Sequence, residues 1–123
     1  MVIDTSVILA VFFSEPQAAW SAGQMKENAG ALRMSTVNLA EALIRIRDKQ
    51  PALADELEER LLESGIRFVP PDAAQARIAA CARLRFPLNL GDCFVYALAV
   101  AENCAILTLD TDFRAVDRPL VMP

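Results

Sequence analysis

Short apolar runs alternate along the chain with longer stretches whose apolar residues recur with helical spacing. The short runs predict strands at residues 1–4, 32–35, 66–69, 105–109 and 119–122. The longer stretches predict helices over residues 5–13, 14–28, 36–49, 51–64, 72–84 and 91–103. Because short apolar strands that alternate with helices are buried on both faces, the pattern predicts a three-layer α/β/α fold with a mostly parallel central sheet.

Length and composition indicate one domain that spans residues 1–123. The chain has 123 residues, of which 54% are hydrophobic and 23% charged, as is typical of a globular protein with a single core. No basic segment precedes the apolar N-terminus, MVIDTSVILAVFF, and Asp4 interrupts it. No window stays apolar over the roughly 18 residues that a membrane span needs. We therefore expect a cytoplasmic protein without membrane contact.

The absence of histidine narrows the possible chemistry. It excludes histidine acid–base ribonucleases, Ser-His-Asp hydrolases and most zinc sites. The three cysteines form no CxxC pair and lie in Ala-rich or apolar segments, so small buried side chains are expected at Cys81, Cys93 and Cys104. An enzyme with this composition works with carboxylates, hydroxyls, arginines or a metal held by oxygen ligands.

The charge balance points in two directions. The formal net charge of −4 by itself argues against a nucleic-acid partner. Lys26 and Lys49 are the only lysines, however, and several of the arginines are close neighbours in the sequence: Arg45 and Arg47, Arg83 and Arg85, Arg114 and Arg118. Local positive charge is therefore available despite the acidic average.

Four carboxylates fall where the predicted fold brings chain segments together. Asp4 and Asp110 end predicted strands, and in a parallel sheet both would lie at the carboxyl edge, where open α/β folds place their sites. Asp92 opens the apolar helix that leads into the strand before Asp110, and Glu41 lies early in the helix after the second strand. Carboxylates that converge in this way repel one another unless a positive charge lies between them.

A hard divalent cation resolves that repulsion. Mg²⁺ and Mn²⁺ prefer carboxylate and water oxygens, and they can activate water for attack on a phosphodiester without any histidine. The sequence therefore predicts a metal site formed by Asp4, Asp92 and Asp110, with Glu41 as a further catalytic acid.

Each of these residues also has a purely structural interpretation. Asp4 can cap the following helix, although Thr5 or Ser6 could do the same. Ser6 could instead bond a carboxylate or a substrate phosphate. Glu41 can pair with Arg45 one helical turn later, and Asp92 can complement the helix dipole. The remaining pair, Asp110 and Asp112, suits a turn, and for Asp112 a turn or an accessory role is the preferred interpretation.

The ordered set of motifs resembles the PIN-domain nucleases, specifically the VapC toxins of bacterial toxin–antitoxin pairs. The similarity lies in VIDTS, STVNLAEAL, LNLGDCFVYALA and TLDTDF, and it extends over essentially the whole chain. The family's acids match Asp4, Glu41, Asp92 and Asp110, with Ser6 and Asp112 as accessory residues. None of the expected acids is missing, so the resemblance implies a PIN-like fold and an active enzyme.

The resemblance implies a Mg²⁺- or Mn²⁺-dependent endoribonuclease that forms a homodimer and is inhibited by an antitoxin, which threads basic residues toward the acidic site. Arginines at the rim would then hold RNA phosphates, and Arg83, Arg85 and Arg114 are the candidates. A receiver domain would need a lysine at a strand end, and an aspartyl phosphatase would need an acid in place of Ser6. The alternative that stays open is a non-catalytic module whose acidic pocket only docks a basic protein.

Overall fold

A five-stranded parallel sheet forms the centre of the molecule. The computed structural model describes residues 1–123, and the strand order is β3-β2-β1-β4-β5 with every neighbouring pair parallel. The strands are β1 (Val2–Ile3), β2 (Arg33–Ser35), β3 (Arg67–Val69), β4 (Ile106–Leu107) and β5 (Leu120–Val121). The helices are α1 (Thr5–Phe12), α2 (Ala18–Glu27), α3 (Thr36–Lys49), α4 (Ala54–Leu62), α5 (Ala73–Arg85) and α6 (Leu90–Glu102), with short 3₁₀ segments η1 (Pro51–Leu53) and η2 (Thr111–Ala115).

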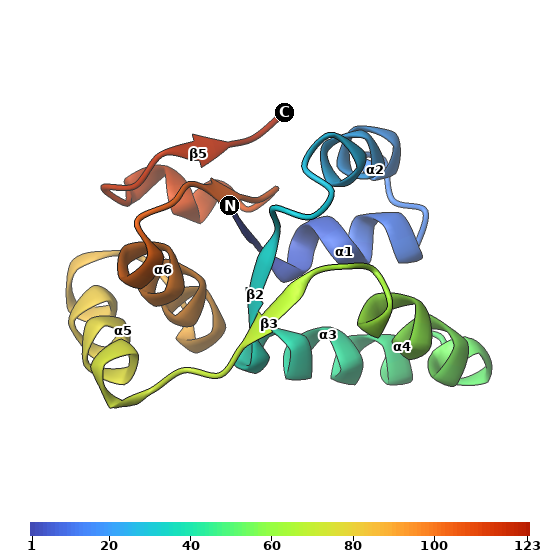
Figure 1. Cartoon of the computed structure of the whole chain (residues 1–123), viewed down its shortest axis with the longest axis horizontal. Helices are drawn as coiled ribbons and strands as arrows, with labels where there is room; N and C mark the ends of the chain where they lie inside the picture. Colours follow the sequence, from blue (N-terminus) through green and yellow to red (C-terminus); the bar gives the residue numbers. More distant parts are fainter.

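The helices cover the sheet from two sides (Figure 1). Helices α5 and α6 pack on one face, and α1 to α4 lie on the other. The division follows the alternation of side chains along each strand. Val2 and Ile106 belong to the hydrophobic cluster under α6, whereas Ile3 and Leu107 belong to the cluster under α1 and α3. The predicted three-layer α/β/α fold is confirmed.

The predicted elements are found in their expected order, with small differences at their ends. Helix α2 begins at Ala18 rather than at residue 14, because Ser14 has a left-handed backbone (φ 51°) and the segment up to Gln17 forms a turn. Ser35 and Asp72 cap α3 and α5 through their side chains, as Ser and Asp commonly do. The expectation of buried cysteines is correct for Cys93 and wrong for Cys81, which is exposed.

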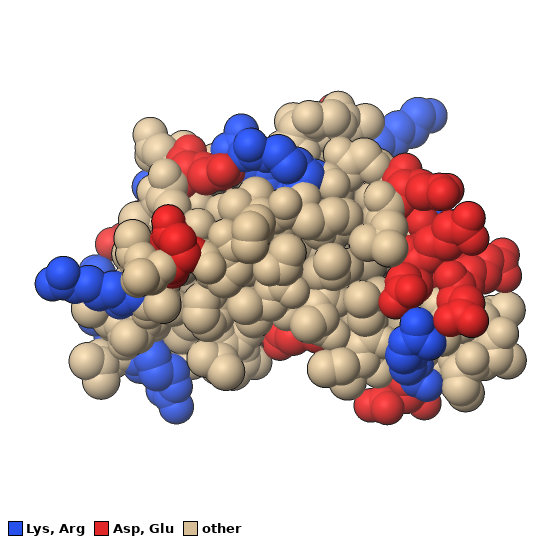
Figure 2. Space-filling view, turned by 60° about the horizontal axis from the view of Figure 1, so that its bottom comes forward, with Lys and Arg blue, Asp and Glu red and all other residues tan.

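Acidic side chains gather at the end of the molecule formed by α4 (Figure 2). The exposed acids of this segment are Asp55, Glu56, Glu59 and Glu63. Much of the negative charge therefore lies on a helix surface rather than at the sheet edge. No single helix has the length and apolar character to cross a membrane, and only the bent pair of α5 and α6 passes a test of length and composition.

Candidate active site

Strands β1 and β4 place two carboxylates side by side at the carboxyl edge of the sheet. Asp4 follows β1, and its backbone N–H donates to the carbonyl of Leu107 at the end of β4 (2.9 Å). Asp110 follows β4 and caps η2 by accepting the N–H of Asp112 (2.9 Å). Asp4 occupies the N-cap position of α1 but makes no side-chain cap bond, so capping does not explain this acid.

Asp92 lies in the first turn of α6 and faces the same edge. Asn89 performs the capping by accepting the N–H of Asp92 (2.9 Å), which leaves the Asp92 carboxylate free. The side chain is 7% exposed, and its Oδ2 has no hydrogen-bond partner. A buried carboxylate oxygen without a donor is costly and is a ready ligand for a cation.

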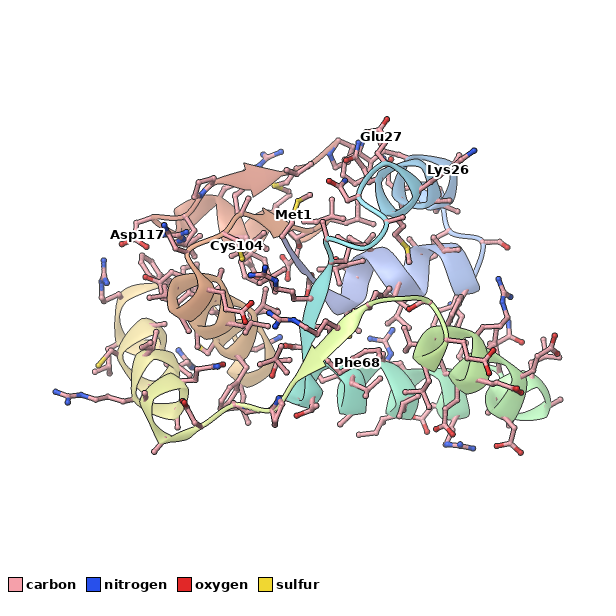
Figure 3. All side chains as sticks on the ribbon, viewed as in Figure 1. Met1, Lys26, Glu27, Phe68, Cys104 and Asp117 are labelled. Atoms are coloured by element: carbon pink, nitrogen blue, oxygen red, sulfur yellow. The ribbon has the colours of Figure 1, made fainter.

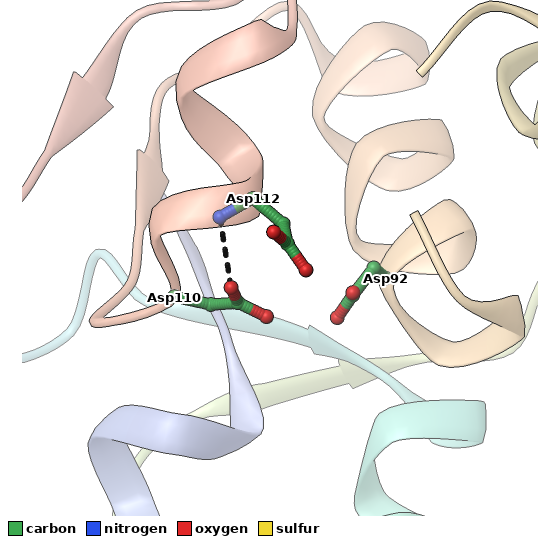
Figure 4. Close-up of side chains that lie close together, drawn as sticks. All are labelled: Asp92, Asp110 and Asp112. Carbon is green, nitrogen blue, oxygen red and sulfur yellow. Dashed lines mark hydrogen bonds between the residues drawn. The ribbon is translucent and has the colours of Figure 1, made fainter. Parts of the chain in front are cut away.

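Asp112 joins Asp92 and Asp110 in a group compatible with metal binding. One carboxylate oxygen from each of the three lies within 4.8 Å of the others, and Figure 4 shows the side chains directed toward one another. The prediction used Asp4 as the third ligand and Asp112 as an accessory residue. In the structure Asp112 is an equal member of this group, whereas Asp4 lies deeper and is 4% exposed.

Glu41 is held by hydrogen bonds rather than by a surface ion pair. Its Oε1 accepts from the Asn38 amide (2.8 Å) and from the Thr5 hydroxyl (3.4 Å). The ion pair with Arg45 that the helical spacing allows is absent. Asn38 also donates to the carbonyl of Gly91 (2.9 Å) and so ties α3 to the start of α6. Sequence reasoning missed Asn38, because an Asn three residues before Glu41 has the same appearance as any polar helix residue.

The carboxylates perturb one another electrostatically. Burial raises the pKa of Asp92 to about 7, and the charges of Asp4, Asp110 and Glu41 act in the same direction. Burial also raises the pKa of Asp4, an effect opposed by hydrogen bonds from Ser6 and Thr108. The electrostatic coupling therefore links all four acids that the sequence singled out.

Thr108 is a member of the site that sequence reasoning did not find. Its hydroxyl donates to Asp4 Oδ2 (2.8 Å) and accepts the N–H of Asp110 (2.9 Å), and the residue is fully buried. Ser6 donates to the same Asp4 oxygen (2.7 Å), so two hydroxyls fix this carboxylate. In sequence, Thr108 is one more β-branched residue in an apolar strand and carries no separate signal.

We expect Thr108→Val to misplace Asp4 and Asp110 while the strand is retained. Valine keeps the shape but leaves Asp4 with one hydroxyl donor and the Asp110 N–H without its acceptor, at a cost of about 1–3 kcal/mol in the free energy of unfolding. The RNA cleavage that the sequence resemblance implies should fall about 10- to 100-fold. Denaturant unfolding and initial cleavage rates measure both effects, and Thr108→Ser, which keeps the hydroxyl, should recover most of the loss. Equal rates for valine and serine would contradict this role.

Gly91, directly before Asp92, is required by the packing of Glu41. A Cβ added at Gly91 would collide with the Glu41 carboxylate, and its nearest neighbours are all atoms of that side chain. The backbone of Gly91 is an ordinary helical one, so the requirement is for space and not for conformational freedom. A glycine precedes Asp92 because α6 lies against the Glu41 side chain of α3 at this position.

A Gly91→Ala variant should fold but lose much of the RNA cleavage that the sequence resemblance implies. The end of the Glu41 side chain can swing away, so the cost to stability stays near 1 kcal/mol, whereas cleavage should drop at least about tenfold. Thermal unfolding and cleavage rates provide the measurement. Gly23→Ala is the matched control, because a Cβ at that helical glycine meets nothing within 4 Å. An active Gly91→Ala variant would show that the position of Glu41 is unimportant.

The predicted arginines differ in their surroundings. Arg85 pairs with Asp117 (3.2 Å), which also accepts the Tyr96 hydroxyl and lies beside α6 (Figure 3). Arg83 and Arg114 are exposed and make no ion pair. Of the two lysines, Lys26 lies at the end of α2, at the periphery of the molecule (Figure 3), and Lys49 packs over Phe13. These positions leave the carboxylate group without a lysine.

The donor set fits a divalent cation of the Mg²⁺ or Mn²⁺ type. All available ligands are carboxylate oxygens, which these ions prefer over nitrogen or sulfur. Asp92 Oδ2 has no hydrogen-bond donor, and the charges of Asp4, Asp110 and Glu41 add to burial in raising the pKa of its carboxyl, so a cation at this place would stabilise the ionised form.

Comparisons with known proteins agree with this architecture. The family model described as PIN domain matches residues 1–119. Among curated proteins, a ribonuclease VapC of Mycolicibacterium smegmatis is 35% identical over 95% of this chain and 96% of its own length. The VapC ribonuclease Mb0625 of Mycobacterium bovis is 32% identical over 96% of this chain and 99% of its own length.

Solved structures show the same fold at lower sequence identity. VapC20 of Mycobacterium tuberculosis, described as a sarcin-ricin loop cleaving toxin, superimposes with a TM-score of 0.85 at 16% identity and covers 99% of this chain and 98% of its own. The VapBC2 complex of Rickettsia felis, bound to a promoter DNA fragment, has a TM-score of 0.80 at 15% identity, with 98% of this chain and 96% of its own covered. The chain therefore belongs to the PIN domain family, among the relatives named VapC.

Proposed function

We propose that this chain is a metal-dependent endoribonuclease that acts in the cytoplasm as the toxin of a toxin–antitoxin pair. The observation that carries the proposal is the convergence of Asp92, Asp110 and Asp112 beside an Asp4 and a Glu41 that other side chains hold in place. The ribonuclease names of relatives over nearly the whole chain support it. One nuclease domain would then span residues 1–123.

The residues of the site would have different roles in binding the metal, positioning the carboxylates and transferring a proton. Asp92, Asp110 and Asp112 would hold Mg²⁺ or Mn²⁺. Asp4, which is more deeply buried, would be a fourth carboxylate ligand. The bound cation would supply charge compensation for the scissile phosphate and would activate water for its hydrolysis. Ser6 and Thr108 orient Asp4, and Asn38 and Thr5 orient Glu41 toward the same edge. Glu41 is the remaining carboxylate positioned to handle a proton.

Charge complementarity supports the proposed protein partner. A group of carboxylates that extends from buried Asp92 to exposed Asp112 and includes an unpartnered oxygen suits a basic segment of an antitoxin, which would compete with metal and RNA. Similar structures include a VapBC complex and a toxin–antitoxin complex of Klebsiella pneumoniae. We also propose a homodimer, with Arg83 and Arg114 as exposed cations for RNA and Arg85 as a weaker candidate because Asp117 already engages it.

The test is cleavage of total RNA and defined structured RNAs by the purified chain, separated from any partner. Fragments of discrete length should form with Mn²⁺ or Mg²⁺, disappear with EDTA, and return when metal is restored. If no RNA is cut with either metal, while a basic peptide binds the acidic edge, the chain is a docking module and the nuclease proposal fails.

A further inference from the structure

A small cavity adjoins the carboxylates between the first turns of α1 and the middle of α3. It has a volume of about 270 Å³, and its lining residues are Thr5, Ser6, Leu9, Glu41, Ile44 and Arg45. The cavity is connected to the site through Ser6, whose hydroxyl donates to Asp4 (2.7 Å), and through Glu41. Figure 4 shows the beginnings of α1 and α3 beside the acidic group. A molecule held here therefore lies next to a phosphodiester at the carboxylates.

The walls of the cavity offer both polar and apolar contacts. Thr5, Ser6 and Glu41 form a polar wall with hydroxyl and carboxylate oxygens. Leu9 and Ile44 form an apolar wall, and Ile44 is 61% exposed, which leaves a large aliphatic surface in water. The combination of a polar wall and an apolar wall is typical of a site for a small, partly polar group.

Arg45 adds a positive charge that no acid of the chain neutralises. It is exposed and makes no ion pair, because Asn38 and Thr5 hold the nearby Glu41 carboxylate. Arg47, two residues further along α3, differs in this respect, since Asp55 (3.3 Å) and Glu58 (3.1 Å) pair with it. Arg45 is therefore the arginine of α3 that remains available for an anion from outside.

We propose that this cavity binds the ribonucleotide adjoining the scissile phosphate. Arg45 contacts the phosphate of that nucleotide, Ile44 and Leu9 pack against its base or sugar, and Glu41 accepts from a ribose hydroxyl. The volume of about 270 Å³ suits a single nucleotide and not a base pair, so the nucleotide held here is unpaired. The inference rests on the proposed ribonuclease function and deepens it by assigning a substrate subsite.

The test compares Arg45→Ala with Arg47→Ala on the same helix. The probe is a fluorescein-labelled single-stranded RNA of ten mixed nucleotides, and anisotropy in EDTA reports binding without cleavage. All variants keep the same carboxylates, so the ratio of each Kd to that of the unmodified chain isolates the contribution of the cavity. Arg45→Ala should weaken binding about 5- to 20-fold and reduce the slope of log K against log salt by about 0.7, the value of one lost phosphate contact to a single strand.

Cleavage kinetics supply the second readout. With Mn²⁺, Arg45→Ala and Ile44→Ser should raise KM for the RNA and change kcat by less than about twofold, because the lost contacts bind substrate and do not touch the reacting atoms. Arg45→Lys should keep the salt slope, and Arg47→Ala should behave like the unmodified chain in every assay.

The outcomes distinguish a failure of the nucleotide subsite from a failure of the ribonuclease function. If the unmodified chain cleaves RNA and Arg45→Ala has an unchanged KM and salt slope, the nucleotide subsite is overturned and the ribonuclease function stands. If Ile44→Ser abolishes binding of an arginine-rich peptide but leaves RNA binding unchanged, the cavity receives a basic protein segment instead, and the proposal is again overturned. Absence of any cleavage by the unmodified chain would remove the ribonuclease function on which the subsite depends.

Discussion

Asp92→Asn should reduce RNA cleavage by at least about 10³-fold without unfolding the protein. The variant keeps the shape of the side chain but removes the charge and the ligand oxygen that lacks a protein partner. Loss of a metal contact of this kind removes several kcal/mol of transition-state stabilisation, and about 4 kcal/mol corresponds to a factor of 10³. Initial rates with saturating Mn²⁺ on one defined RNA measure the effect.

Two comparisons make the Asp92 result specific. Glu63→Gln removes an equal charge from the exposed end of α4 and should leave the rate unchanged. Isothermal titration with Mn²⁺ should show metal binding lost in Asp92→Asn and kept in Glu63→Gln. If Asp92→Asn binds Mn²⁺ and cleaves RNA like the unmodified chain, the carboxylates at the sheet edge are not the catalytic centre.

The metal-free protein should lose stability as pH rises from about 4 to about 7. The folded-state pKa of Asp92 is raised to about 7, above its ordinary value of 3.8, so the folded state holds a proton in this interval that the unfolded state has released. Across this interval the free energy of unfolding falls by on the order of 3 kcal/mol in total, and above pH 7, where the carboxyl is ionised in both states, it changes little. The stabilising contribution is thus complete at acidic pH and lost as pH passes through about 7.

Urea unfolding at several pH values in EDTA measures this dependence. Asp92→Asn should reduce it, leaving the part due to the raised pKa of Asp4, and should be the more stable protein at pH 8, because active-site groups are often held at a cost to stability. Saturating Mn²⁺ at about 100 times its Kd should stabilise the unmodified chain by about 2.7 kcal/mol and the variant far less. A stability profile that is the same for both proteins would show that the Asp92 carboxyl is not destabilised by its surroundings.

The acidic site illustrates which residues a sequence can reveal. Asp4 and Asp110 were predictable because each stands directly after an apolar run, and parallel strands bring such positions to one edge. Asp92 was noticeable as a charge at the head of an apolar helix. Thr108 and Asn38 were not, since a threonine in a strand and an asparagine in a helix are common and their contacts are made with segments remote in sequence.

Some predictions required contacts to decide between two interpretations. The spacing of Glu41 and Arg45 allowed a surface ion pair, but Asn38 and Thr5 hold Glu41 instead, which frees Arg45. The sequence favours a turn or an accessory role for Asp112, whereas the 3₁₀ turn after Asp110 directs its carboxylate toward Asp92. In each case the competing partner comes from another element, so local spacing could not exclude it.

The sequence by itself determined the kinds of elements, their order and the carboxylates at their junctions. These features follow from the hydrophobic period, from caps and from turns, all of which act within a few residues. Only the tertiary structure decided the strand order and the position of the Asp112 carboxylate beside Asp92 and Asp110. It also decided that Glu41 packs against Gly91 and that Arg45 has no acidic partner. Those features depend on which side chains meet across separate elements, because burial and hydrogen bonding there are set by packing between distant segments and not by the neighbours of a residue in the chain.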